Sequence, residues 1–428
     1  MNVIPYPHLN ETLYEEKLPN GLHVYVLPKE GFQKTYATFS TRYGSIDNHF
    51  QVEGGPEIRV PDGIAHFLEH KMFEEPTGDV FATFASRGAS ANAFTSFERT
   101  VYLFSATGQI MENITTLIDF VQNPYFTEEN VEKEKGIIGQ EINMYRDNPD
   151  WRAYYGLIEA LYSKHPVRID IAGTIPSITE ITKDMLYDCY HTFYHPSNMT
   201  VFIAGGVNPE EVISHIRANQ AAKTFKPQGE IRRFFESEPE AVETERKETL
   251  LPVSLPKCLF GFKEKALHEE GDAILKRELT TKLVLEVLLG SSSPIYQKLY
   301  NEGLISDNFS HEYNSSPEYA FSAMGGDTKD PDLLLSRIRE ELDRAKTEGL
   351  DEEAFERSRR KKIGGFLRML NSPEAITNEF TRYLFKGADM FDILKTYESI
   401  TKDEAESRLR EHFDWSRFAV SLVRSERP

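Results

Sequence analysis

The segment from His66 to His70 brings together two histidines and a glutamate at a spacing that suits metal chemistry. It reads HFLEH within the longer run PDGIAHFLEHKMF. Residues at positions i, i+3 and i+4 share one face of an α-helix, so a helix here points His66, Glu69 and His70 the same way. Two imidazoles one turn apart can bind one tetrahedral Zn²⁺. A carboxylate between them lies beside the open coordination position.

The same motif also has an ordinary interpretation. The chain has 12 histidines, and the pattern then arises by chance in roughly a few per cent of such sequences. A histidine on an apolar helix face is more often a core or surface residue than a ligand. The motif alone leaves both interpretations open.

A catalytic zinc site normally has three protein ligands and one water, so a third ligand must come from elsewhere in the chain. The downstream candidates are Glu74, Glu75, Glu98, Glu134, Glu141 and His165. The predicted helix VEKEKGIIGQEINMY offers the better geometry, because Glu134 and Glu141 are seven positions apart and share one face. Ile138 and Ile142 indicate that the Glu141 end is buried, and a buried carboxylate needs a partner such as a metal.

Composition narrows the classes of partner and compartment. The 428 residues carry a net charge of −19, which argues against nucleic acid as a partner. No apolar stretch reaches the roughly 18 residues of a membrane span, and the N-terminal residues resemble neither a secretory signal nor a transit peptide. Cys189 and Cys258 alone cannot build a disulfide framework, which indicates a reducing compartment. We therefore expect a cytoplasmic protein without a membrane partner.

Hydrophobic periodicity predicts the elements that position these residues. In the first half it predicts strands at 22–27, 35–43 and 199–207 and helices at 110–121 and 128–145. In the second half it predicts a strand at 320–326 and helices at 274–289, 330–348 and 352–370. The intervening segment KPQGEIRRFFESEPEAVETERK has no hydrophobic period. We predict a catalytic domain at 1–225, a linker at 226–247 and a second domain at 248–428.

The two halves look like repeats of about 200 residues. FTEENVEKEKGIIGQEI in the first half and LDEEAFERSRRKKIGGFL in the second both begin acidic, become basic and end in an Ile-Gly-containing segment. Phe366 stands near the place that corresponds to Glu141, and the second half has no counterpart of HFLEH. Only the first half is therefore expected to carry the chemistry.

Three first-half motifs together resemble a known family. HFLEH, GASANAFTSFERTVYLF and EKEKGIIGQEI occur in the order typical of the pitrilysin superfamily of inverted-motif zinc peptidases, which includes insulin-degrading enzyme and mitochondrial processing peptidase. The resemblance covers nearly the whole first half, and the second half matches in layout only. It implies an α+β fold of two homologous domains, each an antiparallel or mixed sheet with helices on one face, that forms half of a clamshell.

The resemblance also implies roles for individual residues. Carried over by position, His66, His70 and Glu141 bind one Zn²⁺, and Glu69 is the base that activates the water. Glu134 matches a second acidic residue of the family, which orients a metal ligand without binding the metal itself. The alternative for Glu134 is a solvated helix face.

The strand-like stretch SANAFTS is expected to bind substrate, because an exposed strand edge can pair with an extended peptide. Asn92 and Ala93 match substrate-binding positions of the family, and Phe94 lies beside them, although an aromatic in a strand is more often core. The implied activity is zinc-dependent endopeptidase cleavage of peptides or unfolded segments in a chamber formed by two chains. The alternative is a non-catalytic structural or peptide-binding subunit, which typically lacks the inverted motif.

Family members also use an Arg and a Tyr from the second half to hold the substrate. In PIYQKLYNEGLISDNFSHEYN, Tyr300 stands where Arg is expected, and Ser306 or Asp307 falls near the Tyr position. This departure implies a homologous partner subunit in a heterodimer. A homodimer is the alternative, in which Tyr300, His311 or Tyr313 supplies the hydrogen bonds.

Overall fold

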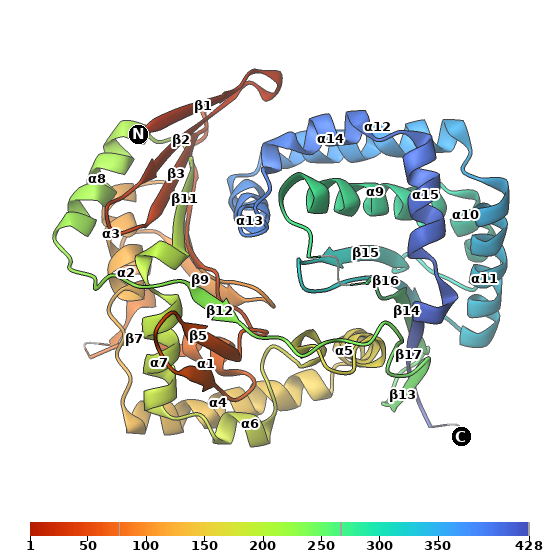
Figure 1. Cartoon of the computed structure of the whole chain (residues 1–428), viewed down its shortest axis with the longest axis horizontal. Coiled ribbons are helices and arrows are strands. Elements are labelled where there is room, and N and C mark those ends of the chain that lie inside the picture. Colours follow the sequence, from red (N-terminus) through yellow and green to blue (C-terminus); the bar gives the residue numbers. More distant parts are fainter. Residues whose placement is uncertain (77, 266–267, 427–428) are drawn as a thin grey trace. The chain divides into compact units, whose positions relative to one another are not determined.

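Two β-sheets with matching strand order organise the chain, which a computed structural model describes at residues 1–76, 78–265 and 268–426 (Figure 1). Each sheet is the centre of one compact unit. The first unit comprises Met1–Ile142, Ile169–Phe235 and Leu370–Arg382, and the second comprises Asn143–Arg168, Glu236–Met369 and Tyr383–Pro428.

The sheet of the first unit has seven strands. Their order is β1 (Asn2–Tyr6), β2 (Glu11–Lys17), β3 (His23–Pro28), β11 (Met199–Gly205), β4 (Thr35–Thr41), β10 (Thr100–Ala106) and β9 (Ser90–Thr95). The pair β3 and β11 is parallel, and the other neighbours are antiparallel. Strand β9 lies at one edge of this sheet, with β10 as its neighbour.

The sheet of the second unit repeats this arrangement without the first two strands. Its order is β13 (Arg246–Leu250), β17 (Phe418–Arg424), β14 (Lys257–Phe262), β16 (Ala320–Asp327) and β15 (Ser310–Ser315). The pair β13 and β17 is parallel and the other neighbours are antiparallel, so strand direction also matches, position by position. This agreement confirms the predicted fold class of two homologous α+β domains with mixed sheets.

Helices and short strands complete the two units. Those in or mostly in the first unit are α1 (Ile64–Lys71), α2 (Val80–Ser86), α3 (Ile110–Val121), α4 (Glu128–Arg146), α6 (Ile175–Thr179), α7 (Lys183–Phe193), α8 (Pro209–Ala221), α13 (Pro373–Leu384), the sheet β12 (Ile231–Arg233), β5 (His49–Val52) and β6 (Glu57–Arg59), and the hairpin β7 (Glu74–Glu75) and β8 (Gly78–Asp79). Those of the second unit are α5 (Pro149–Leu161), α9 (Gly271–Leu289), α10 (Pro294–Asn301), α11 (Pro331–Glu348), α12 (Glu352–Met369), α14 (Ile393–Ser399) and α15 (Lys402–His412). No helix in the described part of the chain is long and apolar enough to cross a membrane.

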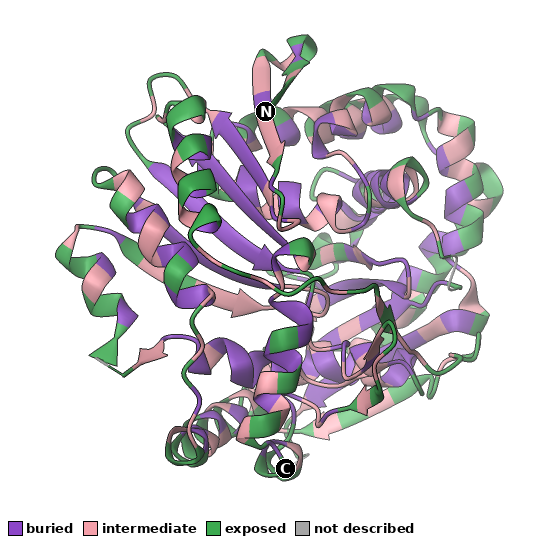
Figure 2. Ribbon diagram, turned by 60° about the vertical axis from the view of Figure 1, so that its left-hand side comes forward, coloured by how far each residue is buried: buried purple, intermediate pink, exposed green. Residues whose placement is uncertain are grey.

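The central strands of the first sheet are covered on both faces. Every residue of β4 and β11 is buried, and Figure 2 shows the central strands of this sheet in the purple of buried residues. Helices α3 and α8 pack on one face, while α13 lies against the other (Figure 1). On that second face the ring of Phe380 lies 4.9 Å from that of Tyr25 and 4.4 Å from that of Phe202. The predicted cover of helices on one face is therefore supplemented by a helix on the other.

A helix from the first half of the sequence packs on the second sheet in the same way. Helix α5 contacts β13, β14 and β17, and its apolar residues, among them Leu157 and Ile158, are fully buried. Gly156 allows this close packing, since a Cβ there would lie 2.4 Å from Oγ of Ser421.

The compact units therefore follow a different division from the one expected at 1–225, 226–247 and 248–428. Residues 143–168 belong to the second unit and Leu370–Arg382 to the first, because α5 and α13 bury their apolar faces there. The segment 226–247, expected as a linker, contains the short strand β12 and the start of β13.

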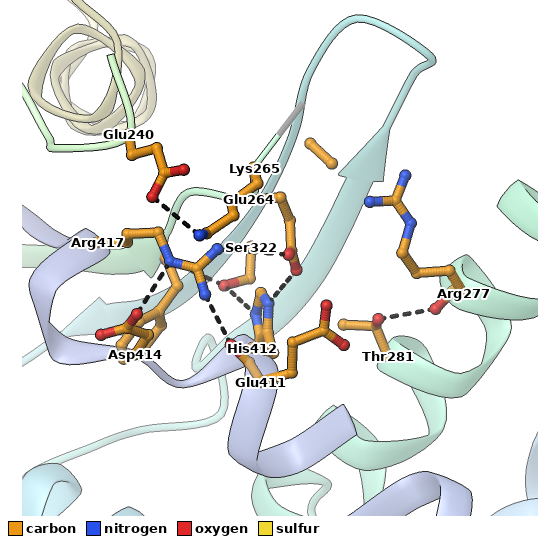
Figure 3. A network of polar contacts seen from close by, with 12 residues as sticks. Glu240, Glu264, Lys265, Arg277, Thr281, Ser322, Glu411, His412, Asp414 and Arg417 are labelled. Atoms are coloured by element: carbon orange, nitrogen blue, oxygen red, sulfur yellow. Dashed lines mark hydrogen bonds and ion pairs between the residues drawn. The ribbon is translucent and has the colours of Figure 1, made fainter. Parts of the chain in front are cut away.

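The core of the second unit contains a buried polar network, drawn in Figure 3. His412 is fully buried, and its Nδ1 lies 2.5 Å from Oε1 of Glu264 while its Nε2 lies 2.9 Å from Oγ of Ser322. Arg408 donates to the same Glu264 oxygen. Burial alone raises the pKa of Glu264, but His412 and Arg408 together hold it well below its usual range.

Candidate metal centre

Helix α1 carries the HFLEH motif, and its apolar residues fix which face it presents. Ile64, Phe67 and Leu68 are buried in the core of the first unit. Gly63 caps the N-terminus of this helix, where φ is +88° and a Cβ would lie 2.5 Å from the carbonyl oxygen of Ala172. Only glycine fits such a start without strain. The predicted helix is thus present, with its beginning set by Pro61-Asp62-Gly63 as expected.

Helix α4 brings Glu141 to the histidines. Its Oε2 lies 3.8 Å from Nε2 of His66 and 3.6 Å from Nε2 of His70. One ligand atom from each of the three residues lies within 4.8 Å of the others. Ile138 and Ile142 are buried beside Glu141, as the sequence indicated.

The chemistry of this donor set fits zinc. Two imidazole nitrogens and a carboxylate oxygen are ordinary zinc ligands, and tetrahedral zinc with bonds near 2.0–2.1 Å separates its ligand atoms by roughly 3.4 Å. The separations of 3.6 and 3.8 Å are close to that value and too long for hydrogen bonds. The three side chains could therefore hold a metal ion with little movement.

Glu134 fixes the orientation of His70. The Nδ1 of His70 lies 3.0 Å from Oε1 of Glu134. A carboxylate only accepts, so Nδ1 carries the proton and Nε2 keeps its lone pair toward Glu141. Burial lowers the pKa of His70, but the hydrogen bond to Glu134 and the nearby carboxylates outweigh it and raise that pKa overall. Glu134 is buried, so it does not lie on the solvated helix face weighed as its alternative.

His66 is neutral at ordinary pH. Burial, followed by the neighbouring His70, lowers the pKa of His66 to about 4. A neutral imidazole is the form that binds a metal.

Glu69 shares the face of both histidines but lies outside the group of three. Its Oε2 accepts a hydrogen bond from Oγ1 of Thr95 on β9, at 2.7 Å. Burial raises the pKa of Glu69, and the Thr95 hydrogen bond acts against that rise. Sequence reasoning did not single out Thr95, although Thr95 lies in the segment SANAFTS that was expected to bind substrate.

The three expected substrate-binding residues lie on the edge strand β9, which contacts α1. Asn92 is exposed, and its Oδ1 accepts from the backbone N–H of Ala93 at 2.9 Å. Phe94 packs against a small core cluster of Tyr36, Val101 and Leu103. Phe94 is only partly buried, so its part in substrate binding stays a prediction beside its packing role.

The remaining candidates lie elsewhere. Glu74 pairs with Lys71, and neither Glu75, Glu98 nor His165 joins the group of three among the described residues. In the second unit Tyr300 is 46% exposed on α10, whereas Tyr313 is buried with its hydroxyl 3.5 Å from Glu264. His311 is mostly buried and its Nε2 lies 3.9 Å from Glu286.

Comparison with known proteins identifies the family. The insulinase family (peptidase family M16) matches residues 57–175, and the peptidase M16 inactive domain matches residues 180–362. A protein of Bacillus subtilis (strain 168) described as an uncharacterized zinc protease, YmfH, is 55% identical over 98% of this chain and 98% of its own length. The chain belongs to the peptidase M16 (insulinase) family. The resemblance found in the motifs is confirmed.

Solved M16 structures share the fold. A protein of Alicyclobacillus acidocaldarius described as an M16-like peptidase has a TM-score of 0.95 and 42% identity, covering 99% of this chain and 100% of its own. Pitrilysin has a TM-score of 0.73 at 15% identity and shares the fold alone, with 98% of this chain matched to 45% of pitrilysin. The match to the M16 inactive domain also agrees with a second half that lacks HFLEH.

Proposed function

We propose that this M16 chain is a zinc-dependent endopeptidase. The observation that carries the proposal is the convergence of His66, His70 and Glu141, with Glu69 on the same helix face. A purely structural zinc site has no use for an unligated buried carboxylate beside its ligands. The relative described as a zinc protease supports the same reading.

In this proposal the two imidazoles and Glu141 hold the zinc, and Glu134 keeps His70 in the required tautomer. Bound zinc would polarise the peptide carbonyl and lower the pKa of a water molecule. Glu69 accepts a proton from the attacking water and returns it to the leaving amine. The raised pKa of Glu69 suits a group that first accepts and then donates a proton, because a pKa closer to the working pH balances the two transfers.

The proposed substrate is an extended peptide paired with β9. Strand β9 lies at the edge of its sheet and contacts α1, and Asn92 and Ala93 lie on it. Recognition through backbone hydrogen bonds favours peptides and unfolded segments over folded proteins.

We further propose that a homologous subunit completes the site. Tyr300 stands in place of the expected Arg, and Tyr313 is occupied in the buried network around Glu264. A heterodimer whose second chain brings the Arg and Tyr fits best, with a homodimer as the alternative. The two chains would enclose the substrate in a chamber.

The test is the substitution Glu69→Gln in chain loaded with zinc. It should keep the metal and the fold and lower peptide hydrolysis by about 10²–10⁴-fold, the usual contribution of a general base. Glu75→Gln is the matched control, since Glu75 lies outside the metal group. Both variants are assayed against a fluorogenic peptide together with the homologous subunit.

Unchanged turnover in zinc-loaded Glu69→Gln would move the base elsewhere. A wild-type chain that binds peptide but never hydrolyses it, with any homologous subunit, would favour the alternative of a non-catalytic peptide-binding subunit.

A further inference from the structure

Lys71 directly follows the HFLEH motif and is completely buried. Its side chain has 0% exposure, at the last position of α1. Lysine is almost never fully buried unless its charge is paired, because removing an ammonium from water is costly. A buried cation next to a ligand histidine therefore calls for a physical reason.

The ammonium of Lys71 lies between two carboxylates. Its Nζ is 2.6 Å from Oε2 of Glu74 and 3.5 Å from Oε2 of Glu134. Both contacts are ion pairs, so charge attraction holds the ammonium in its buried place. The two carboxylates differ in how much they depend on Lys71 to balance their charge. Glu74 is 34% exposed and water can solvate it, whereas Glu134 is 7% exposed.

The two oxygens of Glu134 have separate tasks. Oε1 accepts the Nδ1 proton of His70 at 3.0 Å, and Oε2 faces Lys71. A rotation of the carboxylate that improves one contact disturbs the other. Lys71 thereby restricts Glu134 to the orientation in which His70 is held with Nε2 toward Glu141.

We propose that Lys71 is a positioning residue of the metal site: its buried ammonium holds Glu134 in place, and Glu134 in turn aims His70. This inference rests on the proposed metal-binding function and deepens it. It assigns a role to the residue after the motif, three contacts away from the reacting atoms. Lys71 itself does not touch the metal or the substrate.

The experiment measures Zn²⁺ affinity of the full chain by competition with a chromophoric chelator. Lys71→Met should weaken zinc binding by about 10-fold, the lower end of the effect of outer-shell partners. Glu74→Gln is the matched control: it removes the other carboxylate near Lys71 but leaves Glu134 paired, so affinity should stay within about threefold. The visible spectrum of bound Co²⁺ should change in Lys71→Met and not in Glu74→Gln.

A double-mutant cycle with Glu134→Gln separates positioning from general stability. If Lys71 acts through Glu134, Lys71→Met should cause no further loss of affinity once Glu134→Gln is present. Far-UV circular dichroism and thermal unfolding of the metal-free proteins check the fold. Should Lys71→Met fail to fold, Lys71→Gln and the double variant, which leaves neither buried charge alone, carry the same comparison.

Three outcomes would overturn the proposal. Zinc affinity equal to wild type in a folded Lys71→Met chain would refute the role of Lys71. If His66→Ala still abolished binding, the proposed metal site would stand. Losses that multiply fully in the double variant would show that Lys71 acts independently of Glu134. A wild-type chain that binds no zinc would overturn both this inference and the proposed function.

Discussion

At the scale of single residues, burial decides which charged groups need partners, and the partners decide what these groups can do. In the first unit burial lowers the pKa of His66 to about 4 and keeps it neutral, as a ligand must be. In the second unit the buried Glu264 stays ionised because His412 and Arg408 surround it. Burial and neighbouring charges thus set the protonation state of a candidate metal ligand in one unit and of a structural carboxylate in the other.

The Glu264 network gives a pH-dependent stability prediction. Because its folded-state pKa lies below the unfolded value of about 4.3, Glu264 stabilises the fold above that pH, and the stabilisation is lost as pH falls toward the folded pKa. Glu264→Gln should lower the free energy of unfolding at pH 7 by about 3–5 kcal/mol, since Arg408 loses its buried partner. The deficit relative to wild type should shrink at pH 3.

Urea unfolding at the two pH values provides the measurement. Glu240→Gln, at an exposed ion pair with Lys265 in the same network view (Figure 3), is the control and should have little effect. An equal deficit at pH 7 and pH 3 would contradict the account.

Individual residues were predictable where a motif constrained them. His66, Glu69 and His70 follow from spacing, and Glu141 was one of several candidates that only the family resemblance separated. Thr95 and Lys71 carry no such signal, because a threonine ending a strand and a lysine ending a helix are common. Their roles depend on what other elements bring beside them.

At the scale of elements, two features of the backbone position the site: the start of α1 and the long helix α4. The start of α1 requires glycine at position 63, because φ is positive there and the carbonyl of Ala172 leaves no room for a Cβ. Gly136 on α4 is different, since a Cβ there would meet nothing within 4 Å. These two glycines form a matched pair for testing how the elements support the site.

Gly63→Ala should destabilise the chain by at least about 1–2 kcal/mol, because the left-handed conformation and the clash both oppose a Cβ. It should also reduce zinc retention, because α1 loses its starting geometry. Gly136→Ala should instead stabilise the chain by about 0.5–1 kcal/mol, since alanine favours a helix interior. Thermal unfolding and zinc content measure both effects. Stabilisation by Gly63→Ala would refute the role given to this turn.

Most elements could be predicted from periodicity, but their packing partners could not. The ranges expected for β3, β4, β11, α3, α4, α9, α11 and α12 agree with the structure to within a few residues. The placement of α5 on the second sheet and of α13 on the first lay outside sequence reasoning. An apolar helix face shows that a helix is covered, not which sheet covers it.

At the scale of the whole molecule, the chain matches a two-unit M16 structure over nearly all of both chains, and pitrilysin over less than half of pitrilysin's length. The expectation of a partner subunit follows from that size and from Tyr300 in place of the expected Arg. It stays a prediction, as does a cytoplasmic location.

The isolated chain should therefore bind zinc and yet cleave peptides slowly. Adding a homologous subunit that carries the Arg and Tyr should raise turnover by about 10²–10³-fold for each donor supplied. Replacing that Arg or Tyr in the added subunit should abolish the gain. Sedimentation analysis alongside the assay checks the assembly. Rapid cleavage by a preparation shown to be monomeric would contradict the partner prediction.

The central claim is that His66, His70 and Glu141 form one zinc site, and metal content tests it most directly. Elemental analysis of the purified chain should find close to one zinc per polypeptide. His66→Ala, His70→Ala and Glu141→Ala should each lose it, while His191→Ala, an exposed histidine outside the group, should keep it. Full zinc retention in a folded His70→Ala chain, or no zinc binding by the folded wild type, would contradict the account.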